Sequence, residues 1–258
     1  MSVIGIIPAR MGSSRFPGKP MAKILGMPMI GHVFLRSKMS HSLDELYVAT
    51  PDEQIYNYIN SIGGKAVITL DSHVRCTDRI TEAVQKIEIS NQVQYDVIVN
   101  IQGDEPMVHP KMIDDAIKEI LDNGPAETVN LMAPLATIKE HEDINEVKVV
   151  VDKNNNALYF SREPIPSRKM GSLNVPMFKQ VCIIAFKRDF LFMFSRLEPT
   201  PLEIAESVDM MRAIEHGYKV KMLETSFKTY SVDTSDDLSH VEKLLTNDDL
   251  LNSYIGIN

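Results

Sequence analysis

Short apolar segments alternate with amphipathic segments through the first half of the chain, and this alternation restricts the fold more than any other feature. Strands that are separated by single helices of about ten residues form right-handed βαβ units, so we expect a parallel sheet with helices on both faces. The expected strands are Val3–Ile7, Leu46–Ala49, Ala66–Ile68 and Tyr95–Ile101, and the expected helices are Met29–Lys38, a helix capped by Asp52 that ends at Ile62, Thr77–Ile87 and Met112–Leu121.

The pattern changes after about residue 128, where β-rich segments lie closer together and polar turns separate them. This spacing predicts an inserted antiparallel β subdomain or dimer arm over about 133–187, inside one domain that covers 1–258. Its expected strands are Val147–Val151, Ala157–Phe160 and Gln180–Phe186, and the expected elements after it are helix Arg188–Ser195, helix Glu203–His216, strand Tyr218–Leu223 and helix Asp236–Leu245.

The charge balance and the cysteine content exclude several classes of protein. Lys and Arg number 27 and Asp and Glu number 35, so the net charge of 27 − 35 = −8 disfavours a protein that binds nucleic acid through a general basic field. The two cysteines fit a reducing cytosol. No apolar run approaches the roughly 18 residues of a membrane span, and the N-terminal segment is typical of a first strand rather than a signal peptide. We therefore expect a cytoplasmic protein that is not inserted in a membrane.

The segment from Pro8 to Pro20 follows the first expected strand and concentrates groups that bind anions. It contains the cations Arg10, Arg15 and Lys19, the hydroxyls of Ser13 and Ser14, and two glycines. Fixed positive charge and backbone N–H groups are what a polyphosphate needs. The segment is not a Walker A loop, because five residues separate its glycines where that motif has four and a proline follows the lysine. The alternative is a solvated basic loop.

Three further segments place polar side chains where strands end or helices begin. The buried strand Tyr95–Ile101 is followed by Gln102-Gly103 and then by Asp104, and Asp233 ends a second β-like run. A carboxylate such as that of Asp104, after a buried strand, commonly holds Mg²⁺, although Asp104 could instead cap the next helix and Asp233 could simply occupy a strand–helix turn. Thr77-Asp78-Arg79 begins a helix and could contact a nucleotide or simply cap that helix.

In this order, the segments resemble the family of CMP-sugar-acid synthetases typified by 3-deoxy-manno-octulosonate (KDO) cytidylyltransferases. The resemblance runs from Ile6 to about Leu245. It depends on the segment Pro8 to Pro20, Thr77-Asp78-Arg79, Val99 to Pro106, Val147 to Val150, Ala157 to Arg162 and Val232-Asp233-Thr234. Each segment is a weak signal by itself, and the combination is highly specific.

The resemblance implies a Rossmann-like nucleotidyltransferase fold, CTP and a sugar acid as substrates, Mg²⁺, a homodimer and a role in lipopolysaccharide biosynthesis. It implies catalytic roles for Arg10, Lys19 and Asp104. It also implies that CTP is bound by Arg10, Ser14, Arg15, Lys19, Thr77, Arg79 and Gln102, and that Mg²⁺ is held by Asp104 and Asp233. The resemblance further implies that the acceptor is bound by Gln102, Arg162, Gln180, Asp209 and Met210.

The chain departs from the family pattern at positions that belong to the acceptor side in the family. Gln180 replaces a histidine, Ile184 replaces a tyrosine, and Asp209-Met210 replaces Glu-Gln. Two of these changes remove hydrogen-bonding groups, so besides KDO itself we consider as acceptor a related deoxy sugar acid, or an acid with fewer hydroxyls such as a phosphonate. A nucleotidyltransferase for a sugar phosphate or polyol phosphate, and a nucleotide-binding protein without activity, are the alternative functions.

Overall fold

A computed structural model describes residues 1–12, 15–122, 124–168 and 176–255 of the chain. The chain divides into two compact units: unit 1 comprises 1–115 and 228–258, and unit 2 comprises 116–227. Within the described ranges, no helix has the length and apolar character that crossing a bilayer requires.

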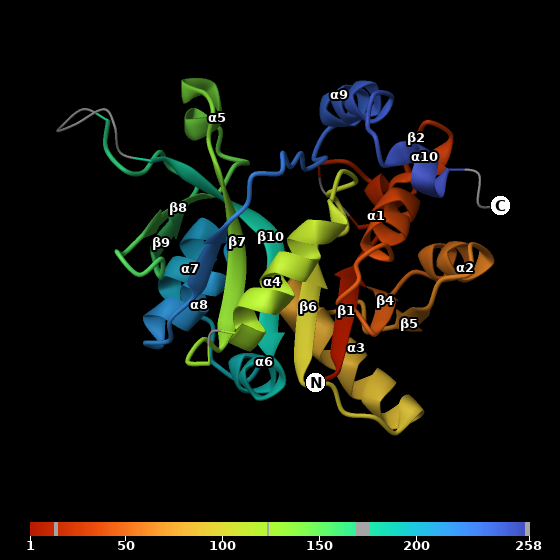
Figure 1. The fold of residues 1–258 in the computed structure, drawn as a ribbon, viewed down its shortest axis with the longest axis horizontal. Coiled ribbons are helices and arrows are strands. Elements are labelled where there is room, and N and C mark those ends of the chain that lie inside the picture. The colour runs from red at the N-terminus through yellow and green to blue at the C-terminus, as the bar shows by residue number, and fades with distance from the viewer. Residues whose placement is uncertain (13–14, 123, 169–175, 256–258) are drawn as a thin grey trace. The chain divides into compact units, whose positions relative to one another are not determined.

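A parallel sheet forms the centre of unit 1, as the sequence predicted. Its strands are ordered β6-β1-β4-β5, with bounds Val97–Ile101, Val3–Pro8, Glu45–Thr50 and Ala66–Ile68. Gly5 in β1 lies opposite Leu46 on one side and Val99 on the other. Every residue of β1 and β6 is buried, which explains why both strands are continuous apolar runs rather than alternating ones. The strands can be followed in Figure 1.

The helices between these strands cover both faces of the sheet. They are α1 (Met29–Ser37), α2 (Glu53–Ser61) and α3 (Cys76–Asn91). The chain moves in one direction from β1 through β4 to β5 and then returns to β6, so right-handed crossovers place α1 and α2 on one face and α3 on the other. This mixed α/β arrangement is the Rossmann-like fold that the sequence predicted, and α3 contacts β1, β4 and β5.

Several further elements complete unit 1. A 3-10 helix, η1 (Lys19–Met21), leads into the antiparallel hairpin of β2 (Lys23–Ile24) and β3 (Met27–Pro28). The C-terminal part of the chain adds α9 (Ser235–Leu245) and α10 (Leu251–Tyr254), and α4 (Pro110–Asp122) begins in unit 1 and continues in unit 2.

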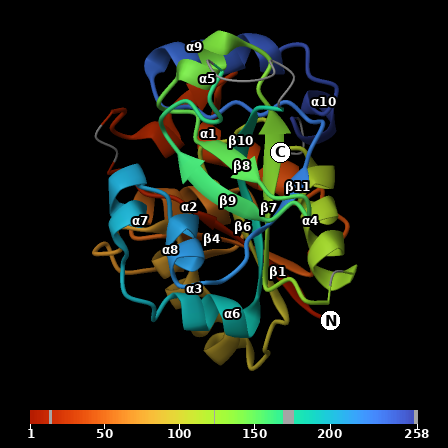
Figure 2. The same ribbon diagram turned by 90° about the vertical axis from the view of Figure 1, so that its left-hand side faces the viewer.

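Unit 2 combines antiparallel and parallel strand pairs. Strand β7 (Thr128–Pro134) pairs antiparallel with β10 (Phe178–Lys187) and parallel with β11 (Lys221–Glu224). Strand β8 (Lys148–Val151) pairs antiparallel with both β10 and β9 (Ala157–Ser161), and Figure 2 shows β8 and β9 side by side. Strands β8, β9 and β10 were predicted from the sequence, whereas β7 was not. The helices are α5 (Ile138–Glu142), α6 (Arg188–Phe194), α7 (Pro201–Glu206) and α8 (Met210–Glu215).

The prediction of one continuous helix over Glu203–His216 was wrong. The chain leaves helical geometry at Ser207, which has a left-handed φ of 53°, and α7 and α8 are separate. The break allows Glu203 and Arg212 to form a buried ion pair with two contacts of 2.7 and 2.6 Å. In a continuous helix these residues, nine positions apart, would be separated by about 13 Å along the axis, so they could not meet.

Candidate active site

A cleft of about 270 Å³ lies at the edge of the unit 1 sheet where β1 and β6 end. Ligands of open α/β sheets bind at this carboxyl edge, because the loops that follow parallel strands meet there. The cleft brings together six residues that the sequence singled out: Arg10, Arg15, Lys19, Gln102, Asp104 and Asp233. The other residues that line it are Pro8, Ala9, Gly12, Pro20, Cys76 and Gly103.

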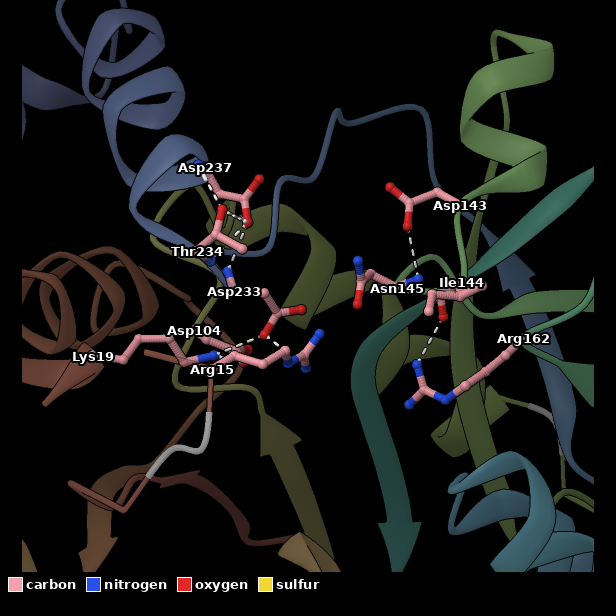
Figure 3. A network of polar contacts seen from close by, with 10 residues as sticks. All are labelled: Arg15, Lys19, Asp104, Asp143, Ile144, Asn145, Arg162, Asp233, Thr234 and Asp237. Carbon is pink, nitrogen blue, oxygen red and sulfur yellow. Dashed lines mark hydrogen bonds and ion pairs between the residues drawn. The ribbon is translucent and has the colours of Figure 1, made fainter. Parts of the chain in front are cut away.

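A cluster of opposite charges lies within the cleft, with Lys19 between Asp104 and Asp233 (Figure 3). The Nζ of Lys19 is 2.7 Å from Oδ2 of Asp104 and 3.1 Å from Oδ1 of Asp233. The Nη2 of Arg15 approaches the same oxygen of Asp233 at 3.1 Å. Burial lowers the pKa of Lys19, but the two carboxylates outweigh it, so the pKa lies above its ordinary value of 10.5. Lys19 is therefore charged throughout the neutral range.

The backbone before Lys19 is fixed by a set of short hydrogen bonds. Gly18 adopts a left-handed φ of 74°, and its N–H donates to the carbonyl of Met11 at 3.0 Å. Asp52 occupies the N-cap position of α2, as predicted, but its side chain makes no cap hydrogen bond and instead accepts the N–H of Met11 at 2.8 Å. The loop that carries the predicted anion-binding groups is thus anchored to the start of a neighbouring helix.

Asp104 and Asp233 are held by backbone contacts with each other's segments. The N–H of Val232 donates to the carbonyl of Asp104 at 2.9 Å. The N–H of Asp233 donates to Oδ2 of Asp237 at 3.0 Å, and Thr234 and Asp237 form a capping box that begins α9. The capping box therefore fixes the carboxylate of Asp233 immediately before a helix.

A small hydrophobic cluster supports the charged residues of the cleft. Three members of the cluster lie close in the chain to these charged residues: Phe16 follows Arg15, Val232 precedes Asp233, and Met107 lies three positions after Asp104. Its remaining members are Ile24, Met29, Tyr230, Leu238, Val241 and Leu245. One apolar cluster thus packs against three segments that are far apart in the sequence, so it fixes their charged side chains relative to one another.

At the helix start predicted to contact a nucleotide, the side chain of Arg79 makes its hydrogen bonds within the protein. Thr77 and Arg79 are buried, and Arg79 donates to Oγ1 of Thr69 at 2.6 Å and to the carbonyl of Leu70 at 3.1 Å. Burial and the nearby Arg10 lower the pKa of Arg79. Cys76, the first residue of α3, lines the cleft and was missed by sequence reasoning. Its place at a helix start beside the predicted motif was the available signal. Ser14 lies outside the described residues.

The remaining acceptor candidates lie in unit 2. Arg162 donates through Nη1 to the carbonyl of Ile144 at 2.9 Å, as Figure 3 shows. It also donates through Nε to the carbonyl of Glu206 at 2.8 Å. The amide of Gln180 donates to Oδ1 of Asn130 at 2.7 Å. Asp209 occupies the N-cap position of α8, and Met210 is completely buried. Their contact with an acceptor stays a prediction.

Comparison with known proteins assigns the chain to a family. The cytidylyltransferase family profile matches residues 4–251. This chain belongs to the cytidylyltransferases. It is 43% identical to the 3-deoxy-manno-octulosonate cytidylyltransferase of Fusobacterium nucleatum, over 93% of this chain and 96% of that protein. It is 40% identical to the mitochondrial enzyme of that name from Arabidopsis thaliana, over 94% of this chain and 83% of that protein.

Solved structures agree with this assignment. A structure of CMP:2-keto-3-deoxy-manno-octonic acid synthetase with CTP has a TM-score of 0.87 and 35% identity, covering 95% of this chain and 99% of that one. A glucose-1-phosphate thymidylyltransferase from Bacillus anthracis, at 16% identity with a TM-score of 0.66, shares the fold over 96% of this chain and 97% of that one. The chain is therefore a nucleotidyltransferase in family and in fold.

The donor set of this cytidylyltransferase fits a magnesium ion that is completed by substrate. Asp104 and Asp233 direct carboxylate oxygens at a single cationic group, Lys19 Nζ. Over the described residues, no group of three or more histidine, cysteine, aspartate or glutamate side chains is arranged to hold a metal. Mg²⁺ is usually bound by one or two carboxylates, together with substrate phosphates and water, so two converging carboxylates suffice.

Proposed function

We propose that this enzyme transfers CMP from CTP to KDO and releases pyrophosphate, with Mg²⁺ bound by Asp104 and Asp233. The observation that carries the proposal is the cluster of Lys19 with these two aspartates at the carboxyl edge of the sheet. It lies in a chain that is 43% identical to a KDO cytidylyltransferase over nearly its whole length. The similar structure that contains CTP supports the choice of nucleotide.

The reaction requires positioning and charge neutralisation rather than a covalent nucleophile. A hydroxyl of the sugar acid attacks the α-phosphorus of CTP in line with the bond to pyrophosphate. The new oxygen–phosphorus bond forms as the hydroxyl proton passes to water, and pyrophosphate leaves with the electrons of the broken bond. Arg10, Arg15 and Lys19 line the cleft and would bind the phosphates as their negative charge shifts to the leaving group. When bound, Mg²⁺ supplies Lewis-acid stabilisation of phosphate oxygens.

The departures from the family pattern at Ile184 and Met210 do not require an acceptor with fewer hydroxyls than KDO. The alternative depended on the loss of polar groups at Ile184 and Met210, but both side chains are buried. Apolar residues at buried positions are explained by packing, so they give no independent reason to expect a different acceptor. Gln180 retains an amide in place of the family's histidine and makes a hydrogen bond through it.

Pyrophosphate release with a panel of substrates tests the proposal. We expect the purified protein to release pyrophosphate with CTP, Mg²⁺ and KDO, and to use UTP and GTP poorly. Release with a phosphonate or another sugar acid, but not with KDO, would overturn the acceptor. Release with a sugar phosphate or polyol phosphate would identify a different nucleotidyltransferase, and the absence of release with every acid would favour a nucleotide-binding protein without activity.

The variant Asp104→Asn tests the metal assignment. We expect kcat to fall at least about 100-fold, because a neutral amide is a poor ligand for Mg²⁺. The melting temperature should change by no more than about 4 °C, since Lys19 keeps Asp233 as a second carboxylate partner. Asp115→Asn, which removes an exposed partner of Lys111, is the matched control and should keep full activity. Wild-type activity in Asp104→Asn would refute the assignment.

We also propose that the enzyme is a homodimer that associates through unit 2. Isolated apolar side chains on a surface are ordinary, and among the described residues each unit has four large ones that are more than half exposed; those of unit 2 are Ile138, Ile144, Leu158 and Ile204. What distinguishes unit 2 is that Ile138, Ile144 and Leu158 lie within the β-rich segment that the sequence predicted as an insertion or dimer arm. Burial of these side chains against a second copy would remove apolar area from water.

A further inference from the structure

We propose that Lys19 acts as a resident counter-ion of the metal site, so that its ammonium group and the metal compete for Asp104 and Asp233. In the free enzyme, the ammonium group of Lys19 would keep both carboxylates occupied. The metal would then bind tightly only together with CTP, whose phosphates offer the ammonium group new partners. This inference rests on the proposed function, because it assumes that these two aspartates are the metal ligands.

The contacts of Lys19 carry the first step of the argument. Its Nζ approaches an oxygen of each carboxylate, at 2.7 and 3.1 Å, so it occupies the point at which the two side chains converge. The Lys19 side chain is only 12% exposed, so the ion pairs are partly shielded from water. A divalent cation placed between the same oxygens would lie next to a like charge, and one of the two cations must leave.

The ammonium group of Lys19 can leave the two carboxylates by moving to another anion. The side chain is a flexible four-carbon stem that projects from η1, and the cleft around it also contains Arg10 and Arg15, so the phosphates of a nucleotide would provide that anion.

The small number of protein ligands carries the second step. Two carboxylates do not form a complete cage for a divalent metal, and such sites are usually completed by phosphate oxygens of the substrate. The free enzyme therefore offers the metal few ligands, and those ligands already have a cationic partner. Nucleotide binding would change both conditions together, since it supplies ligands and withdraws the competing cation.

Mn²⁺ binding to the protein without nucleotide tests the proposal. Mn²⁺ stands in for Mg²⁺, and electron paramagnetic resonance of the free ion gives its dissociation constant. We expect Lys19→Gln to bind Mn²⁺ at least about tenfold more tightly than the wild type, because the competing charge is gone. Lys19→Arg keeps that charge and should bind Mn²⁺ about as weakly as the wild type. Equal or weaker Mn²⁺ binding by Lys19→Gln would overturn the proposal.

Matched variants separate this mechanism from other effects. Lys65→Gln removes the same charge from an ion pair with Glu45, away from the cleft, and should leave Mn²⁺ binding unchanged. A similar gain in Lys65→Gln would overturn the proposal, because net charge alone would then explain it. Lys19→Met, a second neutral variant, should reproduce the gain, and it replaces Lys19→Gln in the titration if thermal unfolding shows that the latter is not folded.

A double variant distinguishes failure of this inference from failure of the proposed function. In Lys19→Gln with Asp104→Asn, the gain in Mn²⁺ affinity should disappear, and its persistence would mean that the metal binds elsewhere. The titration contains neither CTP nor KDO. A wrong acceptor or nucleotide would therefore leave the Mn²⁺ result unchanged, whereas a wild-type enzyme that makes CMP-KDO but shows no gain in Lys19→Gln would refute only the counter-ion role.

Discussion

Gly103 determines where the Asp104 carboxylate lies. A Cβ atom at this position would be 2.6 Å from the carbonyl oxygen of Pro8, closer than packed atoms can approach, and Asp104 follows directly. In Gly103→Ala the loop must therefore move away from the end of β1. We expect the free energy of unfolding to fall by about 1–3 kcal/mol and kcat to fall about tenfold or more. Chemical denaturation and steady-state kinetics measure the two effects.

Gly124→Ala is the control for this substitution. A Cβ atom added at Gly124 meets no atom within 4 Å, so both stability and activity should stay close to the wild type. If Gly103→Ala retained wild-type kcat, the close approach of the loop to β1 would not be what positions Asp104.

At the scale of elements, a buried polar network joins α1 to α10 and to the hairpin after η1. His32, on α1, places Nε2 2.8 Å from the carbonyl oxygen of Ile24 and Nδ1 2.9 Å from the hydroxyl of Tyr254. A carbonyl oxygen only accepts, so Nε2 carries the hydrogen and Nδ1 accepts the hydroxyl of Tyr254. Burial lowers the pKa of His32, the bond to Ile24 opposes this, and the charge of Arg36 lowers it further.

This network predicts a loss of stability in mild acid. Because the folded-state pKa of His32 lies below the ordinary 6.5, the unfolded chain takes up the proton first as the pH falls. The free energy of unfolding should therefore decrease from about pH 6.5 downward, until the pH passes the folded-state value. In His32→Gln the amide keeps a donor for Ile24 but does not titrate, so its stability should depend less on pH. Urea denaturation between pH 5 and about 7.5 measures the difference.

Tyr254→Phe is the matched comparison, because it removes the hydroxyl but retains the histidine. It should be less stable than the wild type by about 1 kcal/mol at neutral pH, with the acid-dependent loss preserved. If the free energies of unfolding of the wild type and of His32→Gln changed equally with pH, His32 would not titrate as we expect.

The elements that the sequence predicted are those whose pattern is local. The buried strands and amphipathic helices of unit 1 follow the expected periods, with ends that differ by a few residues. Strand β7 was missed, and it contains Asn130, whose buried amide donates to the carbonyl of Val181 at 2.7 Å across a bulge in β10. The break at Ser207 brings Glu203 and Arg212, nine positions apart, into a buried ion pair. A cross-strand contact and an ion pair, neither of which periodicity reports, accompany these two features.

At the scale of the whole molecule, the sequence predicted the charged groups of the site better than their arrangement. The βαβ pattern places Lys19 and Asp104, 85 positions apart, at one edge of a sheet. Asp233 is 214 positions from Lys19, and its approach depends on the packing of α9 against the hydrophobic cluster, which no local motif encodes. The commitment of Arg79 to Thr69 and of Arg162 to two backbone carbonyls was likewise invisible in the sequence.

The proposed homodimer makes a prediction about unit 2. Leu158 lies on β9, which among the described strands pairs only with β8, so an apolar side chain projects from a strand at the margin of its sheet. Leu158→Lys would place a charge in an apolar contact and should raise the dimer dissociation constant at least about tenfold. Ile89→Lys, on α3 in unit 1, alters an even more exposed residue and should leave the dimer intact. Sedimentation velocity over a range of concentrations measures both. A monomeric wild type, or equal dissociation constants for the two variants, would contradict association through this strand.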